Sequence, residues 1–331
     1  MPVSARPTAL MVPDRRLALR VLHALVVCLV LFSASRVMAV EYDPARSGVL
    51  VRMGDQSSEY TLMSFFSLAG RFWDIHVTRD GEAVPFTLKV GDTVLARQAA
   101  NHRYKVAPAI GHVDLTLLAD GARPVTLRVF TLRPATETVK GVLNGYRIGE
   151  YPKERYRNQA IYDPPVGFVE VTERNVNLAV SPHYRLGQFV SKQSGGYPKY
   201  LVLQTQLLRK LEYLTELMNE KGYRTNGFHI MSGYRTPFYN KQIKNKLYSR
   251  HQWGGAADIF IDDSPRDNYM DDINRDGKRD VEDVKVMAAL IEEKFDKADY
   301  RQYIGGLGIY KKNAVRGPFI HVDVRGSKAR W

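Results

Sequence analysis

The sequence predicts an α+β fold in which an all-β, sandwich-like domain precedes a mixed C-terminal domain. The length of 331 residues agrees with two domains. Apolar and polar residues alternate from about Val40 to Arg133, which is typical of half-buried strands. Later in the chain the apolar spacing changes to that of helices, and helical and strand-like runs then follow one another. The division into two domains rests on this change of period.

The first predicted domain, residues 40–140, has the pattern of a small antiparallel sandwich. Short alternating runs are separated by turn-forming Asp-Gly or Gly-Asp pairs, at a spacing typical of such folds. The runs are Trp73, Ile75 and Val77; Phe86, Leu88 and Val90; Val113, Leu115 and Leu117; and Val125, Leu127 and Val129. The turns are Asp80-Gly81, Gly91-Asp92 and Asp120-Gly121. No catalytic cluster accompanies these strands, so we expect the chemistry elsewhere.

Residues 141–165 are predicted to be a linker, and residues 166–331 the second domain. The linker contains Pro and Gly, but its many Tyr and Arg residues indicate a structured segment. In the second domain, an apolar stripe at helical spacing predicts a core-facing helix that ends near Gly222. The stripe consists of Leu207, Leu211, Leu214 and Met218. A second helix is predicted from Pro237 through Leu247, and strands at 228–231, 257–261 and 320–324.

Residues 1–39 have the features of a secretory signal peptide. Arg15, Arg16 and Arg20 precede an apolar run from Val21 to Phe32, and Val37-Met38-Ala39 approximates a cleavage site. We therefore expect an exported protein of the periplasm or cell envelope, with no stable membrane span after cleavage. An uncleaved anchor is the alternative, although the run is shorter than the roughly 18 residues that a spanning helix needs.

Cys28 is the only cysteine, and it lies within the predicted signal peptide. The mature chain would therefore have no disulfide and no cysteine-based metal site. A metal would have to bind His, Asp or Glu. Of the net charge of +13, residues 1–39 account for +4 through five Arg and one Asp, so about +9 remains. A basic exported protein suits an anionic wall polymer or lipid surface better than nucleic acid.

A candidate metal site comes from two distant segments. His251 and Asp258 are seven residues apart, and Gly254-Gly255 between them allows the chain to turn back on itself. His321, on a later predicted strand, provides a third ligand. Imidazole nitrogen and carboxylate oxygen are good zinc ligands, and three of them leave one position open, as in catalytic zinc sites.

These segments resemble the signature of the zinc D-Ala-D-Ala metallopeptidases, which share a fold with lysostaphin-type enzymes and the hedgehog domain. In that family S-x-H-x-x-G-x-A-x-D supplies two ligands, and a later His on a strand supplies the third. Ser249, His251, Gly254, Ala256 and Asp258 occupy the corresponding positions here. The His321-Val322-Asp323 sequence and the final Ala329-Arg330-Trp331 are similar to a subgroup of exported murein endopeptidases. The resemblance covers roughly residues 181–331.

The resemblance implies a zinc peptidase that hydrolyses amide bonds in peptidoglycan stem peptides. Arg235 lies in Ser232-Gly233-Tyr234-Arg235-Thr236-Pro237, which matches the family's S-G-Y-R-T segment. Its guanidinium is expected to stabilise the oxyanion of the reaction, since it stays charged and donates a fixed fork of hydrogen bonds. A purely structural role, holding the turn, is the alternative.

Amide hydrolysis also needs a residue that passes a proton to the leaving amine. The residue that has this role in the family is missing from its usual place in this sequence. Relatives place a Glu three residues before the last His or a His two residues before it, and here those positions are Pro318 and Phe319. Asp323 is the substitute that we predict, because residues i and i+2 of a strand share a face. Its competing role is to orient His321 without carrying the proton.

A calcium loop is predicted at residues 272–283. Oxygen-bearing side chains stand at positions 1, 3, 5 and 9, Gly277 is at position 6, and an acid is at position 12. The predicted ligands are Asp272, Asn274, Asp276, Lys278 through its carbonyl, Asp280 and Asp283. A helix should follow from Val284 to Phe295. The loop is an insertion between Asp258 and His321, and the alternative is a solvated acidic loop.

Three functions follow from these observations. The first is a peptidoglycan peptidase that uses Zn²⁺ and Ca²⁺, with a cross-link endopeptidase favoured over a D-Ala carboxypeptidase. The second is an inactive wall-binding module, which the missing Glu or His favours. The third is a calcium-dependent docking protein, which the presence of only one calcium loop disfavours.

Overall fold

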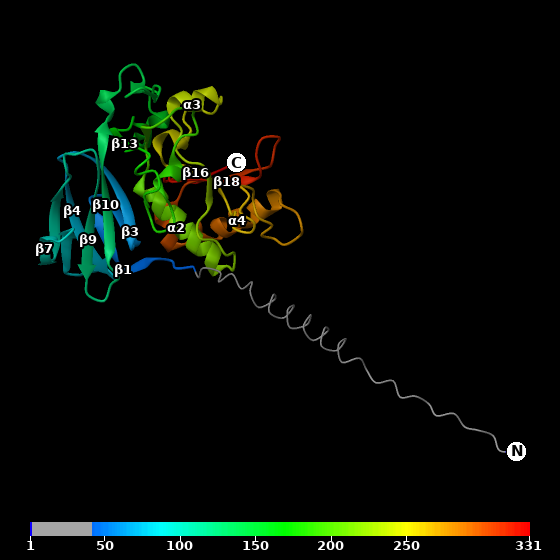
Figure 1. Ribbon diagram of the computed structural model, residues 1–331, viewed down its shortest axis with the longest axis horizontal. Coiled ribbons are helices and arrows are strands. Elements are labelled where there is room, and N and C mark those ends of the chain that lie inside the picture. Colours follow the sequence, from blue (N-terminus) through cyan, green and yellow to red (C-terminus); the bar gives the residue numbers. More distant parts are fainter. Residues whose placement is uncertain (2–41) are drawn as a thin grey trace. The chain divides into compact units, whose positions relative to one another are not determined.

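The computed structural model describes Met1 and residues 42–331 (Figure 1). Apart from Met1, the predicted signal peptide lies outside the described residues. Within the described part, no helix combines the length and the apolar character that crossing a membrane requires. This part of the chain is mostly β-sheet with few helices, so the predicted combination of strands and helices is confirmed at that level.

The N-terminal strands form two sheets around a common core. One sheet has the order β2-β1-β4-β5, with β8 also paired to β4. The other has the order β14-β13-β10-β9-β6-β7, with β3 also paired to β10. The strands are β1 (Arg46–Met53), β2 (Gln56–Tyr60), β3 (Leu62–Leu68), β4 (Phe72–Arg79), β5 (Glu82–Ala83), β6 (Phe86–Val90), β7 (Thr93–Ala99), β8 (Asn101–Lys105), β9 (Gly111–Ala119), β10 (Val125–Pro134), β13 (Gly167–Val171) and β14 (Lys199–Leu201). The alternating runs of the sequence lie on β4, β6, β9 and β10, as predicted.

Two features of these sheets differ from the prediction. The sandwich is not wholly antiparallel, because β3 pairs with β10 in parallel. Only Thr61 separates β2 from β3, so the chain passes from one sheet to the other without a hairpin, and β3 meets a strand that is distant in sequence. The second sheet also extends past the predicted boundary at residue 166, since Arg133 of β10 pairs with Phe168 of β13.

The predicted linker, residues 141–165, is structured, but it does more than connect two domains. It forms the short strands β11 (Val142–Leu143) and β12 (Tyr146–Arg147), followed by single turns of 3-10 helix. The Trp253 indole donates to the Asp163 carbonyl at 2.9 Å, and the Tyr151 hydroxyl donates to the Gln252 carbonyl at 2.9 Å. This segment therefore packs against the loop that carries His251.

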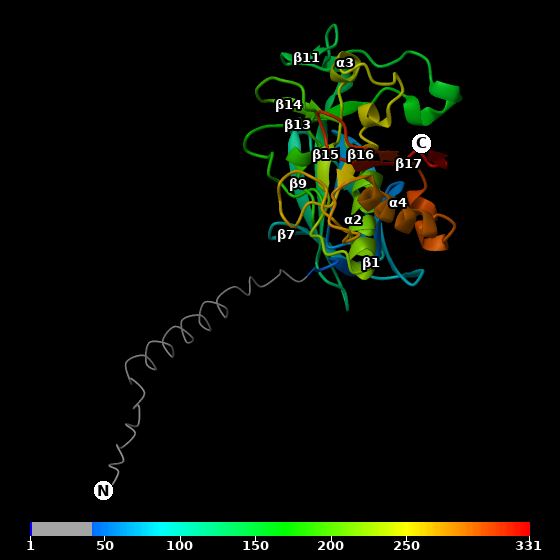
Figure 2. The same cartoon turned by 90° about the vertical axis from the view of Figure 1, so that its right-hand side faces the viewer.

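The C-terminal sheet has the order β15-β16-β18-β17-β19. Its strands are β15 (His229–Ser232), β16 (Ala256–Phe260), β17 (Gly306–Tyr310), β18 (Phe319–Asp323) and β19 (Ala329–Arg330). Helices α2 (Thr205–Glu220) and α4 (Val281–Lys294) cover one face (Figure 2), and Ile259, Ile320 and Val322 are fully buried in the core on that side. The intervening residues, Asp258 and His321, point to the other face because side chains alternate along a strand.

The helix predictions differ in accuracy. In α2 the apolar stripe is fully buried, and the helix ends before Gly222, whose φ is +85°. Helix α3 covers only Pro237–Gln242, so the predicted extension to Leu247 is wrong. The chain leaves the helix at Lys244, where φ is +54°, and the Asn240 amide donates to the Lys246 carbonyl at 3.0 Å. That local hydrogen bond replaces the next helical turn.

Polar contacts join the N-terminal strands to α2. The Glu59 carboxylate accepts from Arg209 Nε at 2.9 Å and from the Tyr303 hydroxyl at 2.9 Å. Arg46 forms a bidentate pair with Glu216 at 2.6–2.7 Å. The sandwich is thus held against the helix that supports the C-terminal sheet.

Candidate metal centre

His251, Asp258 and His321 bring three ligand atoms to one point. His251 Nε2 lies 3.1 Å from Asp258 Oδ1 and 3.1 Å from His321 Nδ1, and the last two atoms are 2.9 Å apart. Zinc ligands at ~2.0–2.2 Å in a tetrahedron lie roughly 3.3 Å from one another, so the spacing fits that metal. Within residues 42–331, this is the only group of three or more His, Cys, Asp or Glu residues whose ligand atoms all lie within 4.8 Å.

Local structure explains how ligands so far apart in sequence meet. His251 is in a short 3-10 helix, η5 (Arg250–Trp253), which Gly254 ends with φ of +62°. A Cβ atom at Gly254 would collide with the backbone of Val202, so only glycine fits this turn. The antiparallel pairing of β16 and β18 then sets Asp258 directly opposite His321. The ligand set therefore depends on one turn and one strand register.

Each histidine is held through its other ring nitrogen. His251 Nδ1 lies 2.6 Å from the Gly233 carbonyl, and His321 Nε2 lies 3.2 Å from Asp323 Oδ2. These acceptors fix tautomers that leave lone pairs on His251 Nε2 and His321 Nδ1, the two atoms that face Asp258. Metal-bound histidines are usually supported in this way. The support is a second observation, besides the distances, that fits a metal.

Burial and hydrogen bonding set the charges of the cluster. Burial lowers the pKa of His251 to about 4, which keeps this imidazole neutral. Burial also opposes ionisation of Asp258, but the neighbouring imidazoles of His251 and His321 and the charge of Arg235 outweigh it and hold the pKa well below its usual value. Burial lowers the pKa of His321, but once protonated the ring can donate to Asp258 from Nδ1 and to Asp323 from Nε2, and this gives a net rise. A proton therefore competes with a metal chiefly at His321.

Arg235 contacts the cluster directly. Its Nη2 donates a short hydrogen bond to Asp258 Oδ2, and its Nε donates to Ser232 Oγ at 2.8 Å. Its backbone N–H donates to the His251 carbonyl at 3.2 Å. Nη1 makes no hydrogen bond to any residue in the described range 42–331. Arg235 thus holds the turn and the carboxylate ligand together, and one end of its guanidinium is free for a further acceptor.

Asp323 lies beside His321, but its carboxylate is already used. Oδ1 accepts from Gly306 N at 2.8 Å, and both oxygens accept from Arg325 Nε at 2.9–3.0 Å. Burial raises the pKa of Asp323, but hydrogen bonds from His321 and Arg325 outweigh it and keep the pKa far below its usual value. Of the two roles predicted for Asp323, these contacts favour orientation of His321 over proton transfer.

The acidic loop at 272–283 has a turned conformation, but its carboxylates do not form a cluster like the one above. Asp272 accepts from Asp276 N and Gly277 N at 3.1 and 2.8 Å, and Gly277 has φ of +82°. Asn274 and Asp276 accept from Asp276 N and Lys278 N at 2.9 and 2.8 Å. Asp280 and buried Asp283 cap helix α4, which begins at Val281 instead of Val284. The oxygens of Asp272, Asn274 and Asp276 thus accept hydrogen bonds from the loop's own backbone.

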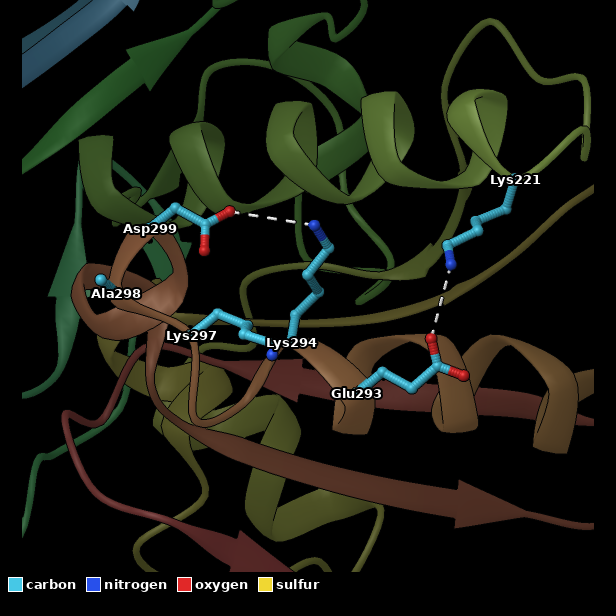
Figure 3. Close-up of a pocket in the computed structure, with 6 residues that line it drawn as sticks. All are labelled: Lys221, Glu293, Lys294, Lys297, Ala298 and Asp299. Carbon is cyan, nitrogen blue, oxygen red and sulfur yellow. Dashed lines mark ion pairs between the residues drawn. The ribbon is translucent and has the colours of Figure 1, made fainter.

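Two hollows in the described surface do not contain the cluster. One, of about 720 Å³, lies beside the end of α2 and of α4 (Figure 3). Its charged groups largely pair with one another, as Lys221 with Glu293 at 3.5 Å and Lys294 with Asp299 at 3.9 Å. The other includes His229, which stacks on Phe260 with ring centroids 4.6 Å apart. His229 is half-buried and is not part of the ligand set.

Three residues beside the cluster were not among the predicted site residues. Arg325 pairs with Asp323, and Trp331 lies against His321 with ring centroids 5.1 Å apart. The Trp331 indole N–H donates to the Tyr310 hydroxyl at 2.6 Å. A signal was available in the alternation of strands, since Asp323 and Arg325 are two residues apart, and in Gly306-Leu307-Gly308, which leaves room for a large neighbour.

Comparison with known proteins gives little information about this chain. No protein-family model matches it, and no curated protein matches it. Among solved structures, the fibronectin(III)-like modules of Clostridium thermocellum CbhA match with 17% identity and a TM-score of 0.18, covering 24% of this chain and 94% of that chain. From a similarity this low we draw nothing about fold or function.

Proposed function

We propose that the protein is a zinc-dependent peptidase that hydrolyses amide bonds in the peptides of peptidoglycan. The observation that carries the proposal is the convergence of His251 Nε2, Asp258 Oδ1 and His321 Nδ1 within 3.1 Å of one another. Three protein ligands are the number typical of catalytic zinc, whereas structural sites have four. The similarity of the ligand segments to D-Ala-D-Ala metallopeptidases supports the hedgehog-like fold and the choice of substrate.

The residues around the centre suit this chemistry. When bound, zinc polarises an amide carbonyl and lowers the pKa of water towards ~7. Arg235 keeps Asp258 in place through Nη2, and its Nη1 can donate to the carbonyl oxygen as negative charge develops there. Asp323 keeps His321 in the tautomer that presents Nδ1. We therefore assign Arg235 to charge stabilisation and Asp323 to positioning.

The cellular setting and the second cation belong to the same proposal. A signal peptide at residues 1–39 and a basic mature chain suit a protein that acts on the wall of a bacterial envelope. Cleavage of cross-links is favoured over removal of terminal D-Ala by the His321-Val322-Asp323 ending. We further propose that Ca²⁺ binds the loop at 272–283, whose Gly277 turn has the conformation that such loops need.

Digestion of purified sacculi tests the proposed activity. We expect mature protein with zinc to release muropeptides and to convert cross-linked dimers to monomers. The chelated protein and His251→Ala should release neither, because both lack the complete metal centre. His229→Ala is the matched control, since this histidine lies outside the ligand set and should leave the products unchanged. Full activity of His251→Ala would refute the proposal.

A further inference from the structure

Trp331 occupies a fixed position beside a metal ligand. Its indole lies 5.1 Å from the His321 ring, centroid to centroid, at an interplanar angle of 48°. Its Nε1 donates to the Tyr310 hydroxyl at 2.6 Å, and its carbonyl accepts from Ile309 N at 3.0 Å. Two hydrogen bonds thus anchor the residue, yet it remains 49% exposed. A large aromatic side chain, fixed and half open to solvent beside a candidate active centre, calls for a functional explanation.

The neighbouring strand β17 is shaped to receive this indole. A Cβ atom at Gly308 would lie 2.5 Å from Trp331 Nε1, and one at Gly306 would lie 2.9 Å from its Cη2. Real Cβ atoms do not approach so closely, so the indole rests on backbone that only glycine leaves bare. Gly308 is also the register partner of His321. The two glycines therefore create the space beside the ligand, and Trp331 fills it.

Contacts on the other side join the indole to the groups that orient His321. The Arg325 guanidinium lies 5.3 Å from the indole centroid and also pairs with Asp323. Asp323 in turn accepts from His321. Tyr310, which anchors the indole, stacks on Phe319 at 4.6 Å with an interplanar angle of 5°. A row of aromatic side chains thus runs from the ligand His321 along β17 and β18, and Trp331 is its exposed member.

We propose that Trp331 is a specificity-determining residue whose exposed indole forms one wall of the substrate cleft at the metal centre. The proposal rests on the proposed peptidase function. An indole face offers apolar contact and favours C–H groups over carboxylates, because its π-face is negative. The part of the substrate that it contacts is the small aliphatic residue next to the scissile bond of a wall peptide. Trp331 then selects the substrate without taking part in the chemistry.

The test compares Trp331→Ala and Trp331→Phe with the parent protein, all loaded with zinc. Zinc content is measured first, because Trp331→Ala would lose the metal if the indole served only to support His321. Binding of dye-labelled, soluble cross-linked wall fragments is then followed through fluorescence anisotropy of the dye within the mixing time, and KM and kcat through product release. We expect Trp331→Ala to retain zinc and kcat, to weaken binding and raise KM about tenfold, and Trp331→Phe to recover part of the loss.

The outcomes separate this proposal from the proposed function. If the fragments bind but are not cut, and Trp331→Ala binds them more weakly, the peptidase function is refuted and the role of Trp331 in the substrate cleft is supported. If Trp331→Ala cuts and binds the fragments with the KM and affinity of the parent, the peptidase function is supported and the role of Trp331 in the substrate cleft is overturned. Loss of zinc in Trp331→Ala, with parental KM in Trp331→Phe, would also overturn it, since the indole would then only support His321.

Discussion

At the residue scale, the two histidines present different nitrogens to the centre. His251 uses Nε2 because Gly233 holds Nδ1, and His321 uses Nδ1 because Asp323 holds Nε2. The sequence predicted that His251, Asp258 and His321 meet, since the spacing of His251 and Asp258 and the strand position of His321 were visible. It could not predict the tautomers, because they depend on a backbone carbonyl and on the end of a strand. These supporting groups decide whether the ligands are ready for a metal.

Replacing Asp323 by Asn separates its two possible roles. If the carboxylate only orients His321, zinc affinity should fall by about 10–100-fold, and kcat at saturating zinc should change little. A proton carrier would instead cost ~10²–10⁴-fold in kcat even when the metal is fully bound. Zinc titration by competition with a chromophoric chelator, followed by kinetics at saturating zinc, distinguishes them. A large loss of kcat with unchanged zinc affinity would contradict the assignment to positioning.

At the scale of elements, the site depends on a turn and on a register that are only partly visible in the sequence. Strands β16 and β18 were predicted, but the opposition of Asp258 and His321 is a tertiary fact. Strands β17 and β19 were not predicted, because one contains two glycines and the other has only two residues. Both position Trp331, so the part of the site that they build was also missed.

Gly254→Ala tests the turn between the first two ligands. Alanine in the left-handed region costs roughly 1–2 kcal/mol, and here its Cβ would also collide with Val202. We expect a loss of stability above that range together with weaker zinc binding. Gly222→Ala is the matched control, since φ is +85° there and the alanine Cβ would have no neighbour within 4 Å. Thermal unfolding of the zinc-loaded proteins should rank the parent first, Gly222→Ala next and Gly254→Ala last. Equal effects of the two substitutions would contradict the account of the turn.

Calcium should stabilise the protein through the loop at 272–283. Extracellular loops of this type bind at ~10⁻⁴–10⁻³ M, so about 5 mM Ca²⁺ should add roughly 1–2 kcal/mol at constant zinc. The measurement is the unfolding temperature with and without calcium, with Asp272→Asn as the variant that should not respond. An unchanged unfolding temperature in the parent would mean that the acids serve only to hold the loop and cap α4.

At the scale of the whole molecule, the domain boundaries could not be predicted from the sequence, because they depend on pairing between strands that are distant in the chain. The boundary at residue 166 was placed by composition, but β13 and β14 continue the sheet of the N-terminal strands. Residues 141–165 were predicted as a linker, yet they pack on the loop of His251. Neither fact has a local signature, because each depends on contacts between segments distant in sequence. The four alternating runs on β4, β6, β9 and β10 and helix α2, by contrast, follow from local periodicity and were predicted correctly.

The contacts between the sandwich and α2 link the N-terminal strands to the candidate metal centre. Glu59 binds Arg209 and Tyr303, and Arg46 binds Glu216, so the sandwich supports the helix behind the C-terminal sheet. Lys210 of the same helix donates to the Asp323 carbonyl at 2.8 Å. The N-terminal strands are therefore part of the framework of the candidate metal centre.

The most direct test of the central claim is a zinc titration of metal-stripped protein that follows cleavage of cross-linked muropeptides. We expect activity to be absent without metal, to rise in proportion to added zinc, and to reach its plateau at one equivalent per chain. His251→Ala and His321→Ala should bind no stoichiometric zinc and should stay inactive. Undiminished activity in the stripped protein, or one tightly bound zinc in His251→Ala, would contradict the assignment of this metal centre.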